Sequence, residues 1–136
     1  MTEKIAPAMQ AFWANDPAPI EMGIDLIEAR DNRAELRLRL EPRHLNGHCT
    51  AHGGVVHLLA DCAAGFAANS TGERAVTQTN TITFLTPSHA GETLTAIGTF
   101  VARSGRSALY DVMVTAEDGR QVAVMRAQMR HIAPKA

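Results

Sequence analysis

The stretch His52–Asn69 reads H-G-G-V-V-H-L-L-A-D-C-A-A-G-F-A-A-N and decides how the rest of the chain must fold. From Gly54 onward it consists almost entirely of Val, Leu, Ala, Cys and Phe. At a rise of ~1.5 Å per residue, a helix from Gly54 to Asn69 would be about 24 Å long, roughly the span of a small domain. A helix that is apolar nearly all round must be covered on most sides by other structure.

One ionisable residue, Asp61, interrupts this apolar run. Burying an unpaired carboxylate is costly, so either a neighbouring group compensates Asp61 or the residue lies at a cleft that water and substrate reach. His57, Asp61 and Gly65 are spaced by four and therefore share one face of the helix. Gly65 costs about 1 kcal/mol relative to Ala in a helix interior. The face belongs either to a core helix with a satisfied Asp or to the wall of a functional cleft.

Two glycines, Gly53 and Gly54, open the helix. Glycines at this position leave the unpaired N–H groups of the first turn accessible, at the positive end of the helix dipole. Such a terminus suits a carbonyl oxygen that becomes negative during acyl transfer. The helix start and Asp61 together therefore favour a functional site along this helix.

The bulk composition is that of one ordinary globular domain. A chain of 136 residues has room for a single domain, residues 1–136, with a real core. A hydrophobic content of 46% and a charged content of 20% are typical of soluble proteins, and the net charge of −1 gives no basic field for nucleic acid or an anionic membrane. The sequence has no membrane-spanning apolar stretch and no signal-peptide pattern, so we expect a cytoplasmic protein.

The rest of the chain is expected to form a short helix and a sheet around the long helix. Residues 4–15 predict a short amphipathic N-terminal helix, and Pro17 and Pro19 indicate a loop. Period-two alternation and turn residues predict strands at Met22–Ala29, Arg33–Leu40, Ala75–Leu85, Glu92–Arg103, Ser107–Ala116 and Gln121–Ile132. Short turns, such as Asp31-Asn32 and Glu117–Arg120, favour antiparallel pairing. We therefore expect an α+β fold with a curled antiparallel sheet of about six strands around one long central helix.

Other catalytic motifs are weak or absent. His44, His48 and His52 are spaced by four, but glycines interrupt a continuous helix there and no Cys or carboxylate lies at a suitable spacing for a metal site. His57 and Asp61 could form two thirds of a Ser-His-Asp triad, but the nucleophile elbow G-x-S-x-G is missing. The phosphate-loop and dinucleotide motifs are missing as well. The remaining candidate is a carboxylate that acts alone or through a water. We therefore expect no metal and no cofactor.

Geometry limits how Asp61 and the helix start can act together. Asp61 lies seven residues beyond Gly54, about 10 Å along the helix axis, whereas a base or nucleophile must come within ~3 Å of its target. The two groups of one chain therefore cannot act on the same carbonyl. Two such helices, antiparallel across a two-fold axis, would bring each Asp61 near the other chain's Gly54, and isologous dimers are the commonest oligomers. A catalytic site here is expected to be shared between subunits.

Residues 44–70 read H-L-N-G-H-C-T-A-H-G-G-V-V-H-L-L-A-D-C-A-A-G-F-A-A-N-S and resemble the signature of hot-dog-fold acyl-CoA thioesterases of the phenylacetic-acid-degradation (PaaI) type. The matching parts are N-G-H, H-G-G, the L-A-D that follows, and a small-residue helix that ends in N-S. The expected strand order fits a hot-dog domain too. The resemblance implies a homotetramer built from dimers that hydrolyses an aryl- or medium acyl-CoA, of the phenylacetyl-CoA or hydroxyphenylacetyl-CoA type, to free acid and CoA.

The resemblance also implies a role for each matching residue. Asp61 matches the catalytic carboxylate, which acts as nucleophile or as general base on water. Asn46 matches a residue that helps to hold the attacking water or the thioester. Gly53 and Gly54 match the helix-start amides that polarise the carbonyl, and His52 matches the histidine beside them.

The residues expected to bind the substrate are indicated by less specific patterns. The apolar acyl pocket is expected to draw on Leu58, Phe66, Met22, Phe12 and Trp13. Cys49 stands where relatives often have Gly, and His57 where an aromatic or apolar side chain is common, so both could reshape this pocket. Arg103 and Arg106 flank the Ser104-Gly105 turn and resemble the basic loop that receives the CoA phosphates.

Two other functions remain as alternatives. A hot-dog dehydratase or hydratase would pair a His with a carboxylate across the dimer, and His52 or His57 with Asp61 could provide that pair. The H-G-G and L-A-D pattern argues against it. A non-catalytic acyl-CoA-binding domain would need no isolated carboxylate, so Asp61 and Asn46 argue against that reading.

Overall fold

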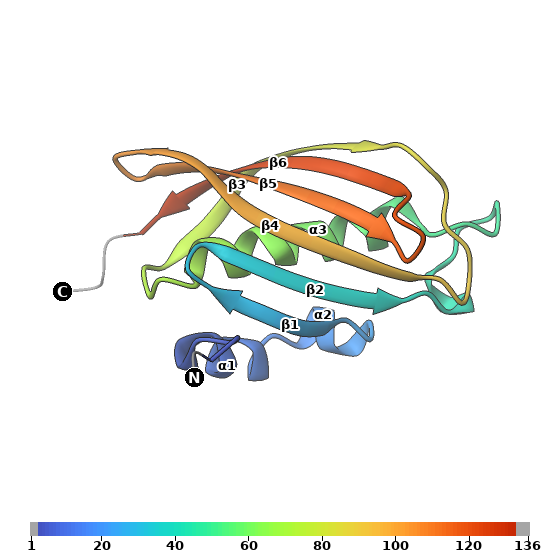
Figure 1. Cartoon of the computed structure of the whole chain (residues 1–136), viewed down its shortest axis with the longest axis horizontal. Coiled ribbons are helices and arrows are strands. Elements are labelled where there is room, and N and C mark those ends of the chain that lie inside the picture. The colour runs from blue at the N-terminus through green and yellow to red at the C-terminus, as the bar shows by residue number, and fades with distance from the viewer. Residues whose placement is uncertain (1–2, 133–136) are drawn as a thin grey trace.

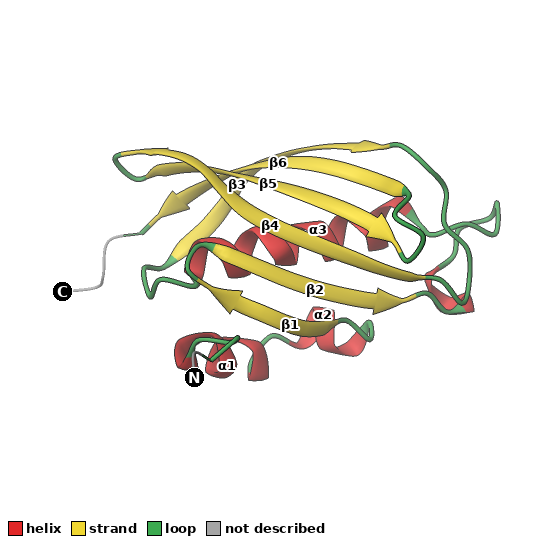
Figure 2. Cartoon of the chain, viewed as in Figure 1, coloured by secondary structure: helices red, strands yellow, loops and turns green. Residues whose placement is uncertain are grey.

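The computed structural model describes residues 3–132, in which six strands and a long helix follow two short N-terminal helices (Figures 1 and 2). The elements are α1 (Pro7–Ala14), α2 (Pro17–Glu21), β1 (Asp25–Arg30), β2 (Arg33–Arg39), a 3₁₀ turn (Pro42–His44), α3 (Gly53–Asn69), β3 (Ala75–Phe84), β4 (Thr93–Ser104), β5 (Ser107–Ala116) and β6 (Gln121–His131). The strands form one sheet in the order β1-β2-β4-β5-β6-β3, and every neighbouring pair is antiparallel. The expected α+β architecture is confirmed.

The segment between α1 and β1 differs from the prediction. Pro17 and Pro19 were expected in a loop, but they lie in the first turn of the five-residue helix α2. The first N–H groups of any helix have no intrahelical partner, so proline is tolerated there. Because Met22 caps α2, β1 begins at Asp25 and not at Met22 as predicted.

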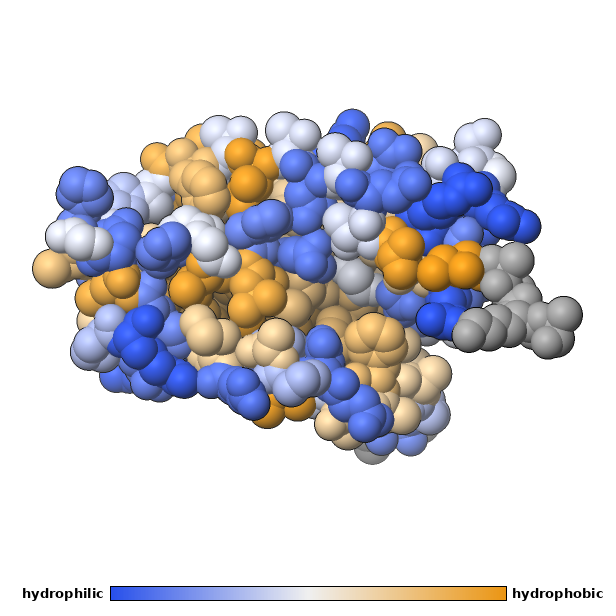
Figure 3. All heavy atoms as spheres, turned by 180° about the vertical axis from the view of Figure 1, so that it is seen from behind, coloured by the Kyte–Doolittle hydropathy of each residue, from blue (hydrophilic) through white to orange (hydrophobic). Residues whose placement is uncertain are grey.

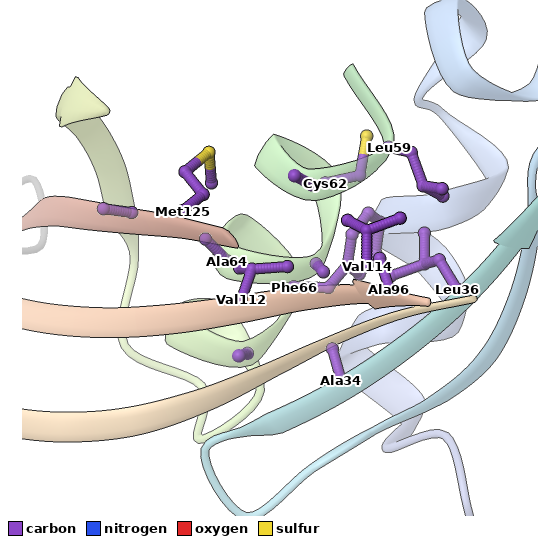
Figure 4. Packing of buried hydrophobic residues seen from close by; sticks show 14 of the residues in the cluster. Ala34, Leu36, Leu59, Cys62, Ala64, Phe66, Ala96, Val112, Val114 and Met125 are labelled. Atoms are coloured by element: carbon purple, nitrogen blue, oxygen red, sulfur yellow. The ribbon is translucent and has the colours of Figure 1, made fainter. Parts of the chain in front are cut away.

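The core lies between α3 and the sheet that curls around it (Figure 1). Every second side chain along these strands points at the helix. The close view in Figure 4 shows this for Ala34, Leu36, Ala96, Val112 and Val114. Gly98 in β4 lets the helix come close, because a Cβ at this position would lie 2.6 Å from the carbonyl oxygen of Ala63 in α3. The absence of one side chain thus sets the distance between α3 and the middle of the sheet.

The predicted hairpin turn between β1 and β2 is confirmed and also fixes the end of α3. Asp31 and Asn32 both have positive φ, 52° and 63°, as a two-residue type I′ hairpin requires. The Asn32 N–H donates to Ser70 Oγ at 2.9 Å, and the buried Tyr110 hydroxyl donates to Asn32 Oδ1 at 2.6 Å. The turn therefore ties the last turn of α3 to the centre of the sheet.

One face of α3 is left uncovered by the sheet. His57, Leu58, Asp61 and Gly65 are partly exposed along it, whereas most of the other α3 residues are buried. Figure 3, which looks at the side opposite to that of Figure 1, shows an apolar band across the middle between hydrophilic flanks. No helix within residues 3–132 is long and apolar enough to cross a membrane.

Strand β3 lies at one edge of the sheet and is mostly exposed. Val76 is 47% exposed and Phe84 52%, and Leu85, directly after the strand, is 51% exposed. A long edge strand presents unpaired backbone N–H and C=O groups and is a template for pairing with another chain. This edge runs beside the uncovered face of α3, since Thr77 and Asn80 of β3 both contact Asp61.

Candidate active site

The start of α3 holds one available backbone amide. The ring of His52 caps the helix, because its Nδ1 accepts a hydrogen bond from the Gly54 N–H at 2.9 Å. The N–H groups of Val55 and Val56 donate to the His52 carbonyl oxygen. Among residues 3–132 the Gly53 N–H has no partner, so Gly53 offers the free amide of the pair that the sequence singled out, and the Gly54 amide is occupied.

Asn46 organises the loop that leads into α3. Its Oδ1 accepts from the His48 N–H at 2.9 Å and from the backbone N–H and hydroxyl of Thr50, both at 3.2 Å. The loop carries Cys49 at a φ of 61°, a left-handed conformation that favours glycine. With Oδ1 occupied by the loop, the Asn46 NH₂ group is left as a donor. Asn46 and Gly53 line one cavity of about 320 Å³, here called the helix-start cavity, together with Thr50, Ala51, Val56, Phe84, Leu85, Thr86, Pro87, Ser88 and Val122.

Asp61 lies in a different cavity of about 240 Å³, here called the carboxylate cavity. Its walls are mostly apolar and come from α1, the segment between α1 and α2, α3, β3 and β6. The residues that line it with Asp61 are Phe12, Asp16, Cys62, Gly65, Phe66, Asn69, Ala75, Val76, Thr77 and Met129. The rings of Phe12 and Phe66 meet edge to face with centroids 5.2 Å apart. Of the residues expected around an acyl pocket, Phe12 and Phe66 line this cavity, Trp13 contacts the Phe66 ring edge to face, and Leu58 and Met22 are not among the lining residues.

Both hydrogen-bond donors to Asp61 come from β3 and reach the same carboxylate oxygen. Asp61 Oδ1 accepts from Thr77 Oγ1 at 3.1 Å and from Asn80 Nδ2 at 2.8 Å. Asn80 Nδ2 also lies 2.9 Å from His57 Nε2. Within the described chain Oδ2 has no hydrogen-bond partner, which leaves this oxygen for a water or a substrate carbon.

Two titratable groups beside Asp61 have raised pKa values. Burial and the nearby charge of Asp61 raise the pKa of Asp16 above its ordinary value. Burial, with the charges of Asp16 and Asp61, raises the pKa of Cys62 to about 12. Cys62 is therefore a protonated thiol at neutral pH, and since the thiolate is the nucleophilic form, Cys62 does not supply a nucleophile to this cavity.

Sequence reasoning missed Thr77 and Asn80, because a regular strand would place them on opposite faces. Residues three apart alternate sides in a strand. A β-bulge between Thr77 and Thr79 shifts the register against β6 and turns both Thr77 and Asn80 toward α3. The run of threonines in this strand gave no signal for the bulge.

The predicted site residues thus fall into two groups at the two ends of one face. Asn46 and Gly53 line the helix-start cavity, and Asp61 lines the carboxylate cavity. Asp61 lies eight positions beyond Gly53, about 12 Å along the helix axis. Neither of these two cavities includes residues of the other group.

Arg103 and Arg106 line a third cavity of about 450 Å³, here called the arginine cavity, with Gly72, Glu73, Arg74, His131 and Ile132. Glu73 pairs with Arg103 through two hydrogen bonds of 2.9 and 3.2 Å. These bonds lower the pKa of Glu73 and raise that of Arg103. Three arginines and one glutamate leave the cavity positively charged, which suits an anionic group.

The histidine series considered for a metal is used in the fold. His44 is fully buried, its Nδ1 accepts from the Glu41 N–H at 2.9 Å, and its Nε2 donates to the Met22 carbonyl oxygen at 2.7 Å. His52 caps α3. In the part of the chain that the structure describes, no group of three metal-ligating side chains comes together.

Comparison with known proteins gives the family. The model of the thioesterase superfamily matches residues 48–123, so the chain belongs to the thioesterase superfamily. Within it, the chain is similar to the acyl-coenzyme A thioesterase PaaI of Escherichia coli K12, with 33% identity over 132 residues that cover 97% of this chain and 94% of that protein. It is thus a member of the PaaI-type acyl-CoA thioesterases, as the motifs of residues 44–70 indicated.

Solved structures support the same placement. The structure of E. coli PaaI, from the phenylacetic acid degradation operon, matches with a TM-score of 0.89 at 33% identity, over 93% of this chain and 91% of that chain. A mutant of the Thermus thermophilus protein PaaI matches with a TM-score of 0.82 at 31% identity, over 86% of this chain and 100% of that chain. A hypothetical thioesterase from Streptococcus pneumoniae TIGR4, solved with coenzyme A, matches with a TM-score of 0.78 at 25% identity, over 83% of this chain and 91% of that chain.

Proposed function

We propose that this protein hydrolyses the thioester of an aryl- or medium acyl-CoA to the free acid and CoA, with Asp61 as nucleophile or general base. The observation that carries the proposal is the state of the Asp61 carboxylate. One oxygen is held by two donors from β3, and the other is free in a cavity walled mainly by apolar side chains. A carboxylate fixed in this way can attack the thioester carbonyl or deprotonate a water that does so.

The site is completed by a second subunit. The helix-start cavity and the carboxylate cavity lie too far apart in one chain to act on one carbonyl. Pairing of two β3 edges across a two-fold axis would extend the sheet, cover the exposed Val76 and Phe84, and set the two α3 helices side by side and antiparallel. Each Asp61 would then face the Gly53 of the other subunit.

In this arrangement the helix start acts on the carbonyl. The free N–H of Gly53 stabilises the negative oxygen that forms as the carbonyl is attacked, while His52 fixes the first turn of the helix. The NH₂ group of Asn46 holds the attacking water or the thioester. His52 accepts at Nδ1, so its neutral ring carries a proton on Nε2 and adds a donor at the exposed helix start.

The acyl group is assigned to the carboxylate cavity. Phe12 and Phe66 offer ring edges and faces to an aryl group, and a Cβ built on Gly65 meets no atom within 4 Å, so the floor is open. The name of the E. coli relative, which comes from a phenylacetic acid degradation operon, supports an aryl substrate. Leu58 and His57, on the same face of α3, would contact the substrate from beside the cavity.

The CoA phosphates are assigned to the arginine cavity. Arg103 is held by Glu73, whereas Arg106 and Arg74 supply further positive charge. Structures of streptococcal relatives hold coenzyme A or acetyl-CoA, which supports a CoA ester as substrate. Two dimers could pair through the outer face of the sheet, where Ile97, Met113 and Val124 lie in an open groove. This would give the homotetramer that the resemblance implies.

A panel of acyl-CoA esters tests the activity. We expect free thiol to be released from aryl- and medium acyl-CoAs, and to be lost in Asp61→Asn while CoA binding persists. Hydration of an enoyl thioester without thiol release would instead identify the dehydratase or hydratase, and saturable binding without turnover the binding domain.

Mixing two inactive variants tests the shared site. Asp61→Asn and Asn46→Ala should each be nearly inactive alone, because each lesion removes one half of every site. In hybrid dimers, one site takes Asp61 from one chain and Asn46 from the other, so mixing equal amounts with subunit exchange should restore about a quarter of the wild-type activity. No recovery in mixtures shown to contain hybrid dimers would exclude a shared site.

A further inference from the structure

A single side chain, Asn80, connects the two polar residues on the uncovered face of α3. Its Nδ2 donates to Asp61 Oδ1 at 2.8 Å and lies 2.9 Å from His57 Nε2. The three residues come from two elements, and only the bulge in β3 brings Asn80 to the helix. Both contacts are made by the same NH₂ group, one through each of its two hydrogens.

An ionised Asp61 carboxylate determines which way the Asn80 amide faces. An ionised carboxylate can only accept hydrogen bonds, so the NH₂ group and not the carbonyl oxygen of Asn80 must face Asp61. The other hydrogen of the same NH₂ group meets His57 Nε2, which must then be an acceptor without a proton. The neutral ring of His57 therefore carries its proton on Nδ1.

The Asn80 amide keeps this orientation although it leaves its own oxygen without a hydrogen bond. Asn80 Oδ1 is buried and has no hydrogen-bond partner among residues 3–132. A buried carbonyl oxygen without a partner is unfavourable, and native structures retain such groups where another role requires them. Here that role is the hydrogen bond that Asn80 donates to Asp61.

We propose that Asn80 is a positioning residue that holds Asp61 ready for hydrolysis, and that protonation of His57 releases it. This inference rests on the proposed hydrolase function. A proton on His57 Nε2 would meet the NH₂ group of Asn80, two donors facing each other. Rotation of the amide by half a turn would give the protonated ring the Oδ1 atom as an acceptor, but it would remove the donor from Asp61. His57 thus makes the active arrangement of Asp61 sensitive to acid.

Within the carboxylate cavity, the charged and titratable groups that face this network are few. On α3 they are Asp61 itself and Cys62, and from the segment between α1 and α2 comes Asp16, which lines the same cavity. Strands β3 and β6 present the uncharged Thr77, Asn80 and Met129. Acid effects on activity that depend on His57 can therefore be separated from those of the two carboxylates by changing His57 alone.

The kinetic test compares Asn80→Ala with the wild type and with a control variant on the same strand. We expect Asn80→Ala to lower kcat at neutral pH by at least ~10-fold, because a misplaced catalytic group loses rate, with KM within about threefold of wild type. Its Tm should stay near that of the wild type, since the substitution removes two hydrogen bonds but also an unpartnered buried oxygen. Gln78→Ala, on the same strand but exposed and bonded only to Gln128, is the matched control and should retain wild-type kcat.

The pH test uses His57→Gln, whose amide oxygen still accepts from Asn80 but cannot titrate. The wild-type kcat should fall toward acid over the range in which histidines titrate, about pH 5 to 8, and this fall should disappear in His57→Gln. Wild-type kcat in Asn80→Ala, or the same acid limb in both proteins, overturns the inference. If Asp61→Asn itself keeps full activity, it is the proposed hydrolase function that fails.

Discussion

At the scale of single residues, local backbone conformation and ionisation decide what the site can do. Asp61 has one oxygen held and one free, Cys62 is kept as a thiol by burial, and Gly53 keeps a free amide because His52 takes that of Gly54. None of these states is evident from residue type. Each depends on a neighbour that only the fold supplies.

Cys49 is the residue whose backbone conformation suits it least. Its φ of 61° lies in the left-handed region, which costs a residue with a Cβ about 1 kcal/mol relative to glycine. Cys49→Gly should therefore raise the free energy of unfolding by up to about 1 kcal/mol, measured by urea denaturation. Cys49→Ala, which keeps the Cβ, is the control and should not stabilise the protein. Equal effects of the two substitutions would place the origin in the thiol and not in the backbone.

At the scale of elements, the contact of α3 with the sheet and the bulge in β3 position the site. The long helix, the six strands and the hairpin turns could be predicted from periodicity, because burial on one or on all sides leaves a clear pattern. The start of β1 lies three residues later than predicted. The short helix α2 could not, since its two prolines are equally typical of a loop. Thr77 and Asn80 could not either, because a bulge changes which residues share a face without changing the composition of the strand.

Alanine substitutions at two glycines should have opposite effects on stability. One glycine lies where the sheet packs against α3, and the other lies on the uncovered face of α3. Gly98→Ala would force a Cβ against the Ala63 carbonyl oxygen at 2.6 Å and should destabilise the protein by about 1–3 kcal/mol. Gly65→Ala meets no atom within 4 Å and should stabilise α3 by up to about 1 kcal/mol. Thermal and urea unfolding measure both effects.

Gly65→Ala should also change the activity. The added methyl group enters the carboxylate cavity, so KM should rise more for aryl-CoA than for short acyl-CoA substrates. A uniform change for all acyl chains would mean that the acyl group does not lie over Gly65.

At the scale of the whole molecule, stability should depend on pH through His131, which lies at the end of β6 and is 4% exposed. Burial and the nearby Arg103 lower the pKa of His131, and Glu73 opposes them. The unfolded chain therefore binds a proton that the folded chain does not, and stability falls as the pH drops below the unfolded value of about 6.5. Urea unfolding at about pH 5 and 7.5 should show a smaller difference for His131→Gln than for the wild type. Identical differences would assign the acid sensitivity to other groups.

The proposed sharing of the site, with Asp61 from one subunit and Asn46 and Gly53 from the other, has a genetic consequence. In a cell that makes both normal and altered chains, a subunit with a single lesion at Asp61 or at Asn46 leaves one working site in every mixed pair. A subunit that carries both lesions disables both sites of its normal partner, one through each end of the helix. The double variant should therefore be dominant-negative on co-expression, whereas either single variant should be recessive.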